Sequence, residues 1–185
     1  LLKRWYAERK DMQKKLKAAI DAGNKIEEEY WDKRQLVKKI NLNSLYGAIL
    51  NPGCRFFDKR IGQSTTLTGR QIAKHMAAKV NEMVTGEYDH VGKAIIYGDT
   101  DSCYFSAYTT LKNDIQKKLI PWDKEIVIQL YDNISDQVNS TFPDLMLDAF
   151  HCPKSRGEVI KAGREIVASK GLFITKKRYA VLVYD

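Results

Sequence analysis

The sequence has few cysteines, and none of them has a paired spacing. Cys54, Cys103 and Cys152 are isolated, odd in number and free of any CxxC pattern. They predict neither a disulfide framework nor a zinc site, and this usage fits a reducing cytosol. We therefore expect a cytoplasmic protein without a structural disulfide.

Long apolar runs, repeats and low-complexity tracts are also missing. No apolar stretch is long enough to span a membrane, and no charged-then-apolar leader opens the sequence. These absences argue against a membrane partner. The chain opens with "LLKRWYAERK", without an initiator Met and already at helical spacing, so we expect it to be a piece of a longer polypeptide.

What the chain does have is apolar content and positive charge. Of its 185 residues, 44% are hydrophobic and 10% are aromatic, which is enough for a real core. Lys and Arg number 31 against 23 Asp and Glu, a formal net charge of +8. This excess suits a polyanionic partner such as nucleic acid or an anionic membrane surface, although an ordinary basic, solvated surface would give the same balance.

Apolar spacing predicts helices followed by a small sheet. Two long helices, over residues 2–21 and 25–46, are separated by "DAGN" and form an antiparallel helical hairpin. "NPG" at residues 51–53 ends the second helix, and further helices are expected over residues 64–84 and 122–150. Strands are expected in "KAIIY", "SCYFSAY", "GEVIKAG", "EIVASKGLFIT" and "RYAVLVYD". The fold class is therefore α+β.

Two carboxylates stand two residues apart in "YGDTDS", between the first two predicted strands. A strand–turn–strand would let Asp99 and Asp101 converge at the tip. Carboxylate oxygens are the ligands that Mg²⁺ takes in proteins, usually together with substrate phosphates. Gly, Asp, Thr and Ser are also preferred turn residues, so the segment alone leaves a simple hairpin turn open.

A polar stripe on the second helix is the other signal. "KINLNSLYG" places Lys39, Asn43, Tyr46 and Gly47 on one helical face. A lysine there can hold a phosphate, and the tyrosine offers a flat face and a hydroxyl to a base pair. Gly47 permits close approach of another backbone or a duplex. The alternative is an ordinary exposed helix face.

The order K-x3-N-S-x-Y-G, then YGDTDS, then "KKRY" resembles the family B DNA polymerases. "INLNSLYGAILN", "CRFFDKR", "GREIVASKG" and "KKRYAVLVYD" are similar to the replicative polymerases of T-even-type phages. The resemblance covers nearly the whole chain. It implies a fingers helical hairpin in residues 1–50 and part of a palm in residues 51–185.

The resemblance also implies roles for individual residues. Asp101 would bind two catalytic Mg²⁺ ions, Asp99 would tune their geometry, and Glu165 is a further acidic residue near them. The implied nucleotide-binding residues are Arg9, Lys39, Asn43 and Tyr46. The implied DNA-binding residues are Gly47, Lys176, Lys177, Arg178 and Tyr179. The family's lysine four residues after Arg9 is replaced by Gln13, with Lys14 next to it, so the second phosphate contact of the first helix is unassigned.

The implied activity is DNA-templated transfer of dNTP onto a primer 3′-hydroxyl in DNA replication. The implied partners are primer–template DNA, dNTP, the remainder of the polymerase in the same chain or a split subunit, and a sliding clamp. The upstream motif D-x-x-S-L-Y-P, exonuclease motifs and a thumb are not in the sequence. We therefore expect the isolated segment to be inactive. Two alternatives remain: a non-catalytic primer–template binding module and an RNA-templated palm polymerase.

Overall fold

The computed structural model describes all 185 residues and consists of two compact units, residues 1–67 and 68–185. The first contains α1 (Leu2–Asp21), α2 (Lys25–Leu50) and the start of α3 (Lys59–Thr85). The second contains the rest of α3, then β1 (Ile95–Asp99), β2 (Ser102–Phe105), α4 (Tyr108–Gln116), α5 (Lys124–Phe150), α6 (Lys154–Gly157), β3 (Ala168–Thr175) and β4 (Arg178–Val183). The proposed division between fingers and palm at residue 50 stays a prediction.

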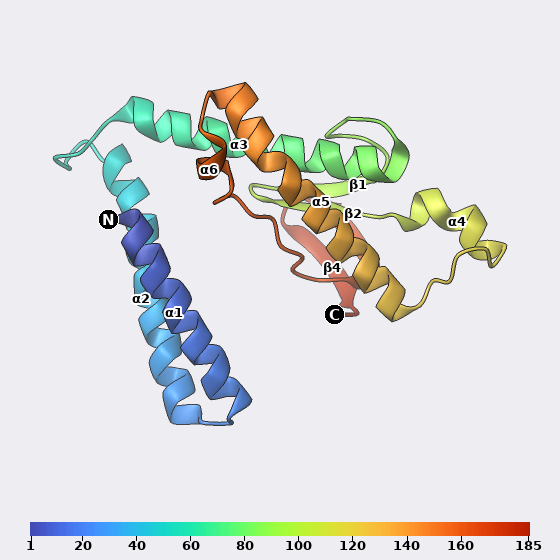
Figure 1. Ribbon diagram of the computed structural model, residues 1–185, viewed down its shortest axis with the longest axis horizontal. Coiled ribbons are helices and arrows are strands. Elements are labelled where there is room, and N and C mark those ends of the chain that lie inside the picture. The colour runs from blue at the N-terminus through green and yellow to red at the C-terminus, as the bar shows by residue number, and fades with distance from the viewer. The chain divides into compact units, whose positions relative to one another are not determined.

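The predicted helical hairpin is confirmed, since α1 and α2 lie side by side and antiparallel (Figure 1). Gly23 turns the chain with a φ of +67°, a region open to glycine at little cost. The Asn24 side chain then accepts a hydrogen bond from the N–H of Glu27 at 3.3 Å and caps α2. Across the hairpin, Lys38 Nζ lies 2.5 Å from Glu8 Oε2.

The second helix runs four residues beyond its predicted end at Tyr46 and stops at Leu50, next to the predicted break. Gly62 of α3 lies directly against its last turn. A Cβ on Gly62 would be 2.0 Å from Leu50 Cδ2, so a larger residue there would require the Leu50 side chain to move.

The core of the second unit is formed by α3 and α5. Val80 of α3 is buried with Ile134, Val138 and Phe142 of α5, and the strand pair β1–β2 packs against them through Ile95 and Phe105 as part of a larger half-buried set. The two sheets are antiparallel pairs, β1–β2 and β3–β4. The mixed helix-and-sheet class is confirmed, with six helices and two small antiparallel sheets.

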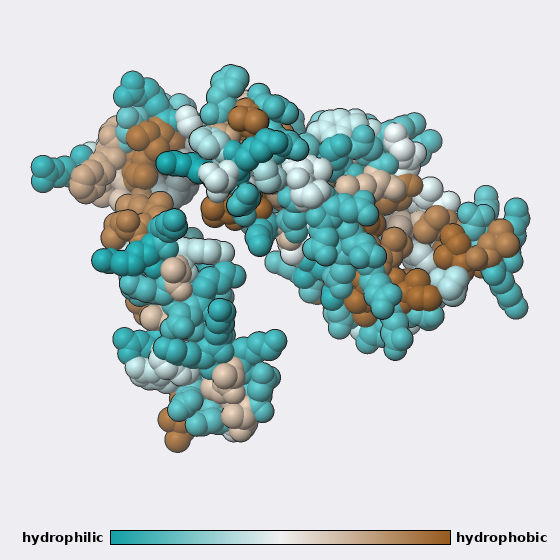
Figure 2. Space-filling view, viewed as in Figure 1, coloured by the Kyte–Doolittle hydropathy of each residue, from teal (hydrophilic) through white to brown (hydrophobic).

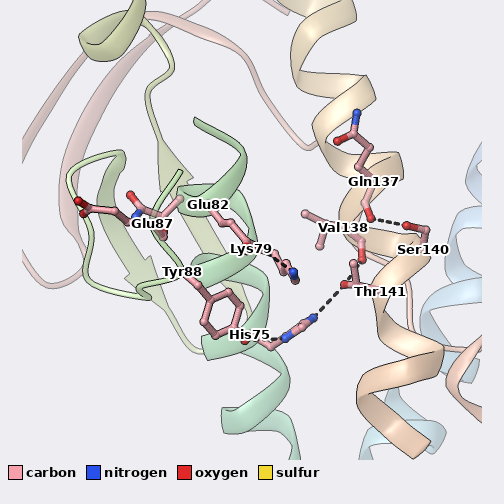
Figure 3. A network of polar contacts seen from close by, with 10 residues as sticks. His75, Lys79, Glu82, Glu87, Tyr88, Gln137, Val138, Ser140 and Thr141 are labelled. Carbon is pink, nitrogen blue, oxygen red and sulfur yellow. Dashed lines mark hydrogen bonds and ion pairs between the residues drawn. The ribbon is translucent and has the colours of Figure 1, made fainter. Parts of the chain in front are cut away.

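A polar contact also joins the two core helices. Figure 3 shows His75 of α3 between Tyr88 and Thr141, with ring nitrogens 2.8 Å and 2.9 Å from their hydroxyl oxygens. The Thr141 hydroxyl donates to the carbonyl of Val138, so His75 Nε2–H donates to Thr141, and in the neutral imidazole Nδ1 accepts from the Tyr88 hydroxyl. Desolvation by burial lowers the pKa of this imidazole, which favours its neutral form.

The strand predicted for "GEVIKAG" is wrong. Residues 154–157 form α6, and the chain is irregular from there to β3. The side chain of Asn139 on α5 donates to the carbonyl of Ala162 at 2.9 Å and accepts from its N–H at 2.7 Å. Because the Asn139 side chain satisfies the N–H and the carbonyl of Ala162, this residue needs no hydrogen-bond partner on a neighbouring strand.

The surface of the helical hairpin is mostly polar. In Figure 2 hydrophilic residues cover most of its visible face, with isolated apolar residues between them. None of the six helices is long and apolar enough to cross a membrane.

Candidate active site

The acidic segment forms the tip of the β1–β2 hairpin, as predicted. Asp99 pairs with Ser102, so Thr100 and Asp101 make a two-residue loop. Thr100 has a φ of +52°, and the N–H of Asp101 donates to the carbonyl of Asp99 at 2.6 Å. A β-branched residue is rarely found in this left-handed region, so the tip holds a strained backbone.

The two carboxylates have different surroundings. Asp99 accepts a hydrogen bond from the Thr100 hydroxyl at 3.2 Å, and its other oxygen lies 3.9 Å from Lys177 Nζ. Asp101 is exposed, and its carboxylate has neither a hydrogen bond nor an ion pair within the protein. Asp101 is therefore the carboxylate free to take an external ligand, while Asp99 is restrained by its neighbours.

The β3–β4 turn reaches the acidic tip. Lys176 and Lys177 form a two-residue loop, since Thr175 pairs with Arg178. Lys177 has a φ of +63°, and its N–H donates to the hydroxyl of Tyr97 at 2.9 Å. The structure thus brings "YGDTDS" and "KKRY" together, although β1 and β4 belong to different sheets.

An aromatic cluster of Tyr97, Tyr104, Phe173 and Tyr179 joins these two sheets. Its ring centroids are 5.3–6.0 Å apart, and the rings of Phe173 and Tyr179 are stacked. The Tyr104 hydroxyl donates to Tyr179 at 3.1 Å. This hydrogen bond, followed by desolvation, raises the pKa of Tyr104 to about 12. Tyr104 therefore stays protonated at neutral pH and remains a donor.

Glu165 lies in the irregular segment before β3. It lines a cavity of about 620 Å³ together with Asp101, Ser102 and Tyr104. Next to it, Arg164 lies 2.6 Å from Asp132 on α5 and 2.7 Å from the Asp185 side chain, which fixes the segment that carries Glu165. Two predicted acidic site residues thus face the same cavity.

The acidic residues do not by themselves complete a metal site. No three His, Cys, Asp or Glu side chains in the chain are grouped closely enough to hold a metal ion. Asp99 and Asp101 nevertheless offer only oxygen atoms, the donor type that Mg²⁺ prefers. The donor chemistry of these two carboxylates therefore suits a hard cation.

The predicted stripe on α2 is exposed along its length. Lys39, Asn43, Tyr46 and Gly47 are all accessible, and a Cβ on Gly47 would meet nothing within 4 Å. Lys39 makes no ion pair, whereas its neighbour Lys38 is paired with Glu8. The charge of Lys39 is thus available to an external anion.

A hydrogen bond fixes the ring of Tyr46 within the same unit. Its hydroxyl lies 2.5 Å from Thr66 Oγ1 on α3. The Thr66 hydroxyl donates to the carbonyl of Gly62 at 3.1 Å, so the Tyr46 hydroxyl is the donor in this pair. The hydrogen bond restricts the ring while leaving it partly exposed.

Arg9 lies half-buried on α1, and its Nε–H donates to Gln35 Oε1 on α2 at 3.3 Å. Gln13, one turn later on α1, is also half-buried, while Lys14 is exposed. Five residues of helix separate Lys14 from Arg9, which places the two side chains about 140° apart around the axis. Lys14 therefore does not share the face of Arg9.

Sequence reasoning missed the residues that hold these groups in place. Gln35 is one turn before Lys39, and extending the α2 stripe by four residues would have included it. Tyr97 and Tyr104 are cross-strand partners in β1 and β2, a pairing that the hairpin itself predicts. No pattern in the nearby sequence predicts that these two tyrosines contact the β3–β4 hairpin.

Comparison with known proteins assigns the family. The sequence profile of DNA polymerase family B matches residues 1–150, most of the chain. The chain belongs to DNA polymerase family B. The resemblance found in its motifs is thereby confirmed.

Family B relatives occur in phages, archaea and animals. The chain is 29% identical over 170 residues to the DNA-directed DNA polymerase of Enterobacteria phage T4, covering 82% of the chain. It is 39% identical over 74 residues to that of Escherichia phage RB69, covering 40% of the chain. A DNA polymerase of Thermococcus gorgonarius is 28% identical over 175 residues, or 95% of the chain.

These relatives are much longer proteins. The chain spans 18% of the T4 and Thermococcus gorgonarius polymerases and 8% of the RB69 polymerase. No solved structure matches the chain significantly. The matches therefore cover only a small part of the length of these relatives.

Proposed function

We propose that this chain is the fingers hairpin and part of the catalytic palm of a DNA-templated DNA polymerase. Residues 1–50 would bind the incoming dNTP, and residues 51–185 would carry part of the reaction centre. The observation that carries the proposal is the acidic tip: Asp101 is exposed and unpaired, beside a basic turn whose Lys177 reaches Asp99. This pairing suits a centre where a divalent cation and a nucleic-acid backbone meet.

Asp101 and Asp99 would supply part of the ligand set of two Mg²⁺ ions, with the remaining ligands coming from the rest of the polymerase and the nucleotide. Such ions, when bound, supply Lewis acidity to the primer 3′-hydroxyl and to the triphosphate. Glu165 faces the same cavity as Asp101 and adds negative charge there. It would attract cations to the centre without needing to bind them directly.

The basic turn would hold the nucleic acid, and the α2 stripe would mainly hold the incoming nucleotide. Lys176, Lys177 and Arg178 are exposed and suit the phosphates of primer–template DNA. Lys39, unpaired, would hold the triphosphate, with Asn43 beside it and Arg9 on the first helix. Tyr46 and Gly47 would lie along the nascent base pair, since one offers a restrained ring and the other an open backbone.

The test is Asp101→Asn in the complete polymerase, which removes the charge but keeps the shape. We expect nucleotide addition to fall by orders of magnitude while the Kd for primer–template DNA stays unchanged. Asp136→Asn, at an exposed position on α5, is the matched control and should keep full activity. Unchanged primer extension by Asp101→Asn would refute the assignment.

Template choice separates this proposal from an RNA-templated polymerase. The complete enzyme should extend a primer on a DNA template and not on an RNA template of the same sequence. Extension on RNA alone would contradict it.

A further inference from the structure

One side-chain relay links the two helices of the hairpin through a neutral amide. Arg9 Nε–H on α1 donates to Gln35 Oε1 on α2 at 3.3 Å, across 26 residues of sequence. Gln35 Nε2 in turn donates to Asp32 Oδ1 on the same helix at 3.0 Å. The amide therefore connects a guanidinium group to a carboxylate that does not touch it.

The chemistry of the three groups fixes the orientation of the amide. A guanidinium can only donate hydrogen bonds, and an ionised carboxylate can only accept them. The amide oxygen of Gln35 must therefore face Arg9, and its NH₂ must face Asp32. A flipped amide would break both hydrogen bonds, so Asp32 determines which end of Gln35 is presented to the arginine.

A neutral partner distinguishes Arg9 from Arg4 and Lys38 of the same hairpin. Arg4 and Lys38 both approach Glu8, at 3.6 Å and 2.5 Å, so carboxylate charge offsets theirs. Arg9 has no ion pair, and its only hydrogen bond uses Nε. Its two terminal nitrogens, which form the fork that binds phosphate oxygens, are left free and fully charged.

Gln35 also stands one helical turn before Lys39, so both side chains project from the same side of α2, about 6 Å apart along the axis. We propose that Gln35 is a positioning residue that holds Arg9 for the triphosphate of the incoming nucleotide without neutralising its charge. This inference rests on the proposed role of Arg9 in nucleotide binding.

The experiment measures KM for dNTP and kcat in the complete polymerase for Arg9→Ala, Gln35→Ala, the double variant and Gln35→Glu. Loss of one hydrogen bond to a charged group should raise KM by about three- to tenfold in Gln35→Ala, with a smaller change in kcat. Because Gln35 acts through Arg9, the double variant should be no worse than Arg9→Ala alone.

Gln35→Glu tests whether the neutral charge of Gln35 matters in addition to its hydrogen bond to Arg9. A glutamate there would still accept from Arg9 but would neutralise it, so KM should rise at least as much as in Gln35→Ala. Glu29→Ala, which removes an exposed ion pair on α2, is the control and should keep the wild-type KM. An unchanged Kd for primer–template DNA in all variants would show that the polymerase is folded.

The two ideas fail in different ways. A normal KM in Arg9→Ala would overturn the nucleotide-binding role of Arg9 and the positioning role with it. A raised KM in Arg9→Ala would overturn the positioning role alone if Gln35→Ala keeps the wild-type KM, if the two losses add in the double variant, or if Gln35→Glu binds dNTP normally.

Discussion

The hydroxyl of Tyr97 accepts a hydrogen bond from the backbone N–H of Lys177 at 2.9 Å, although 80 residues separate them. Tyr97 lies two residues before Asp99 on β1, and Lys177 is in the turn of the other sheet. This hydrogen bond and the ion pair between Lys177 and Asp99 both couple the basic turn to the acidic tip. The position of the turn therefore depends on residues of the acidic hairpin.

Tyr97→Phe should loosen that coupling. The hydrogen bond is exposed, so its loss should cost about 0.5 kcal/mol and weaken primer–template binding about twofold. The measurement is the Kd for primer–template DNA in the complete polymerase. Tyr184→Phe removes a hydroxyl that makes no hydrogen bond and should leave the Kd unchanged.

Lys39 and Lys38 form a natural matched pair. Lys39→Ala should raise KM for dNTP roughly ten- to a hundredfold, because a charge-assisted phosphate contact is lost. Lys38→Ala should leave KM near the wild-type value and lower hairpin stability by about 0.5 kcal/mol, since Lys38 already pairs with Glu8. Steady-state kinetics decide the matter, and equal KM values in the two variants would contradict the assignment.

Gly92→Ala should strongly destabilise the second unit. A Cβ on Gly92 would lie 2.1 Å from the side-chain nitrogen of Asn81, which is fully buried. That amide donates to the carbonyl of Glu87 and accepts from the N–H of Ala94, so it has no room to move. We expect a loss of about 2–3 kcal/mol, measured by thermal unfolding.

Gly69→Ala is the control for this glycine. Gly69 is an exposed position of α3 with nothing within 4 Å of the added Cβ. Alanine there should stabilise the helix by about 0.5–1 kcal/mol. Destabilisation of similar size in both variants would mean that the contact with Asn81 is not the cause.

His75 should make stability depend on pH. Desolvation lowers the pKa of its imidazole below the ordinary 6.5, Lys79 lowers it further, and Glu82 partly opposes them. The unfolded chain therefore takes up the proton first as the pH falls. The stability that neutral His75 contributes is complete above pH 6.5 and is lost as the pH falls from there through the lowered pKa.

His75→Gln tests this dependence, since glutamine does not titrate. Its unfolding midpoint should change less below pH 6.5 than that of the wild type. The same pH profile in wild type and His75→Gln would exclude His75 as its source.

Local sequence patterns were sufficient to predict the helical hairpin and the acidic tip of the β1–β2 hairpin. Apolar spacing and the "DAGN" stop predicted α1 and α2, because both signals lie within the segments concerned. α4 (Tyr108–Gln116) was not predicted, and "GEVIKAG" was predicted as a strand. In the "GEVIKAG" segment, the side-chain amide of Asn139 forms hydrogen bonds with both the N–H and the carbonyl of Ala162. Gly157 packs closely on α5, where a Cβ on Gly157 would lie 2.8 Å from the Cα of Pro143.

The positioning residues of the site were harder to predict than its chemical groups. Asp101 and Lys39 stood out by residue type and motif. Gln35, Tyr97 and Thr66 form hydrogen bonds with residues on other elements, and periodicity does not tell which elements meet. Their roles depend on tertiary contacts that sequence spacing alone does not encode.

The aromatic cluster limits how the β3–β4 turn can change length. Phe173 pairs with Tyr179 across this hairpin, and side chains alternate between the two faces of a strand, so an insertion that shifted β4 by one residue against β3 would turn Tyr179 away from Phe173, Tyr97 and Tyr104. Substitutions of Lys176 leave that alternation intact. Among related sequences, this turn should therefore vary in composition, and any change in its length should keep the pairing of Phe173 with Tyr179.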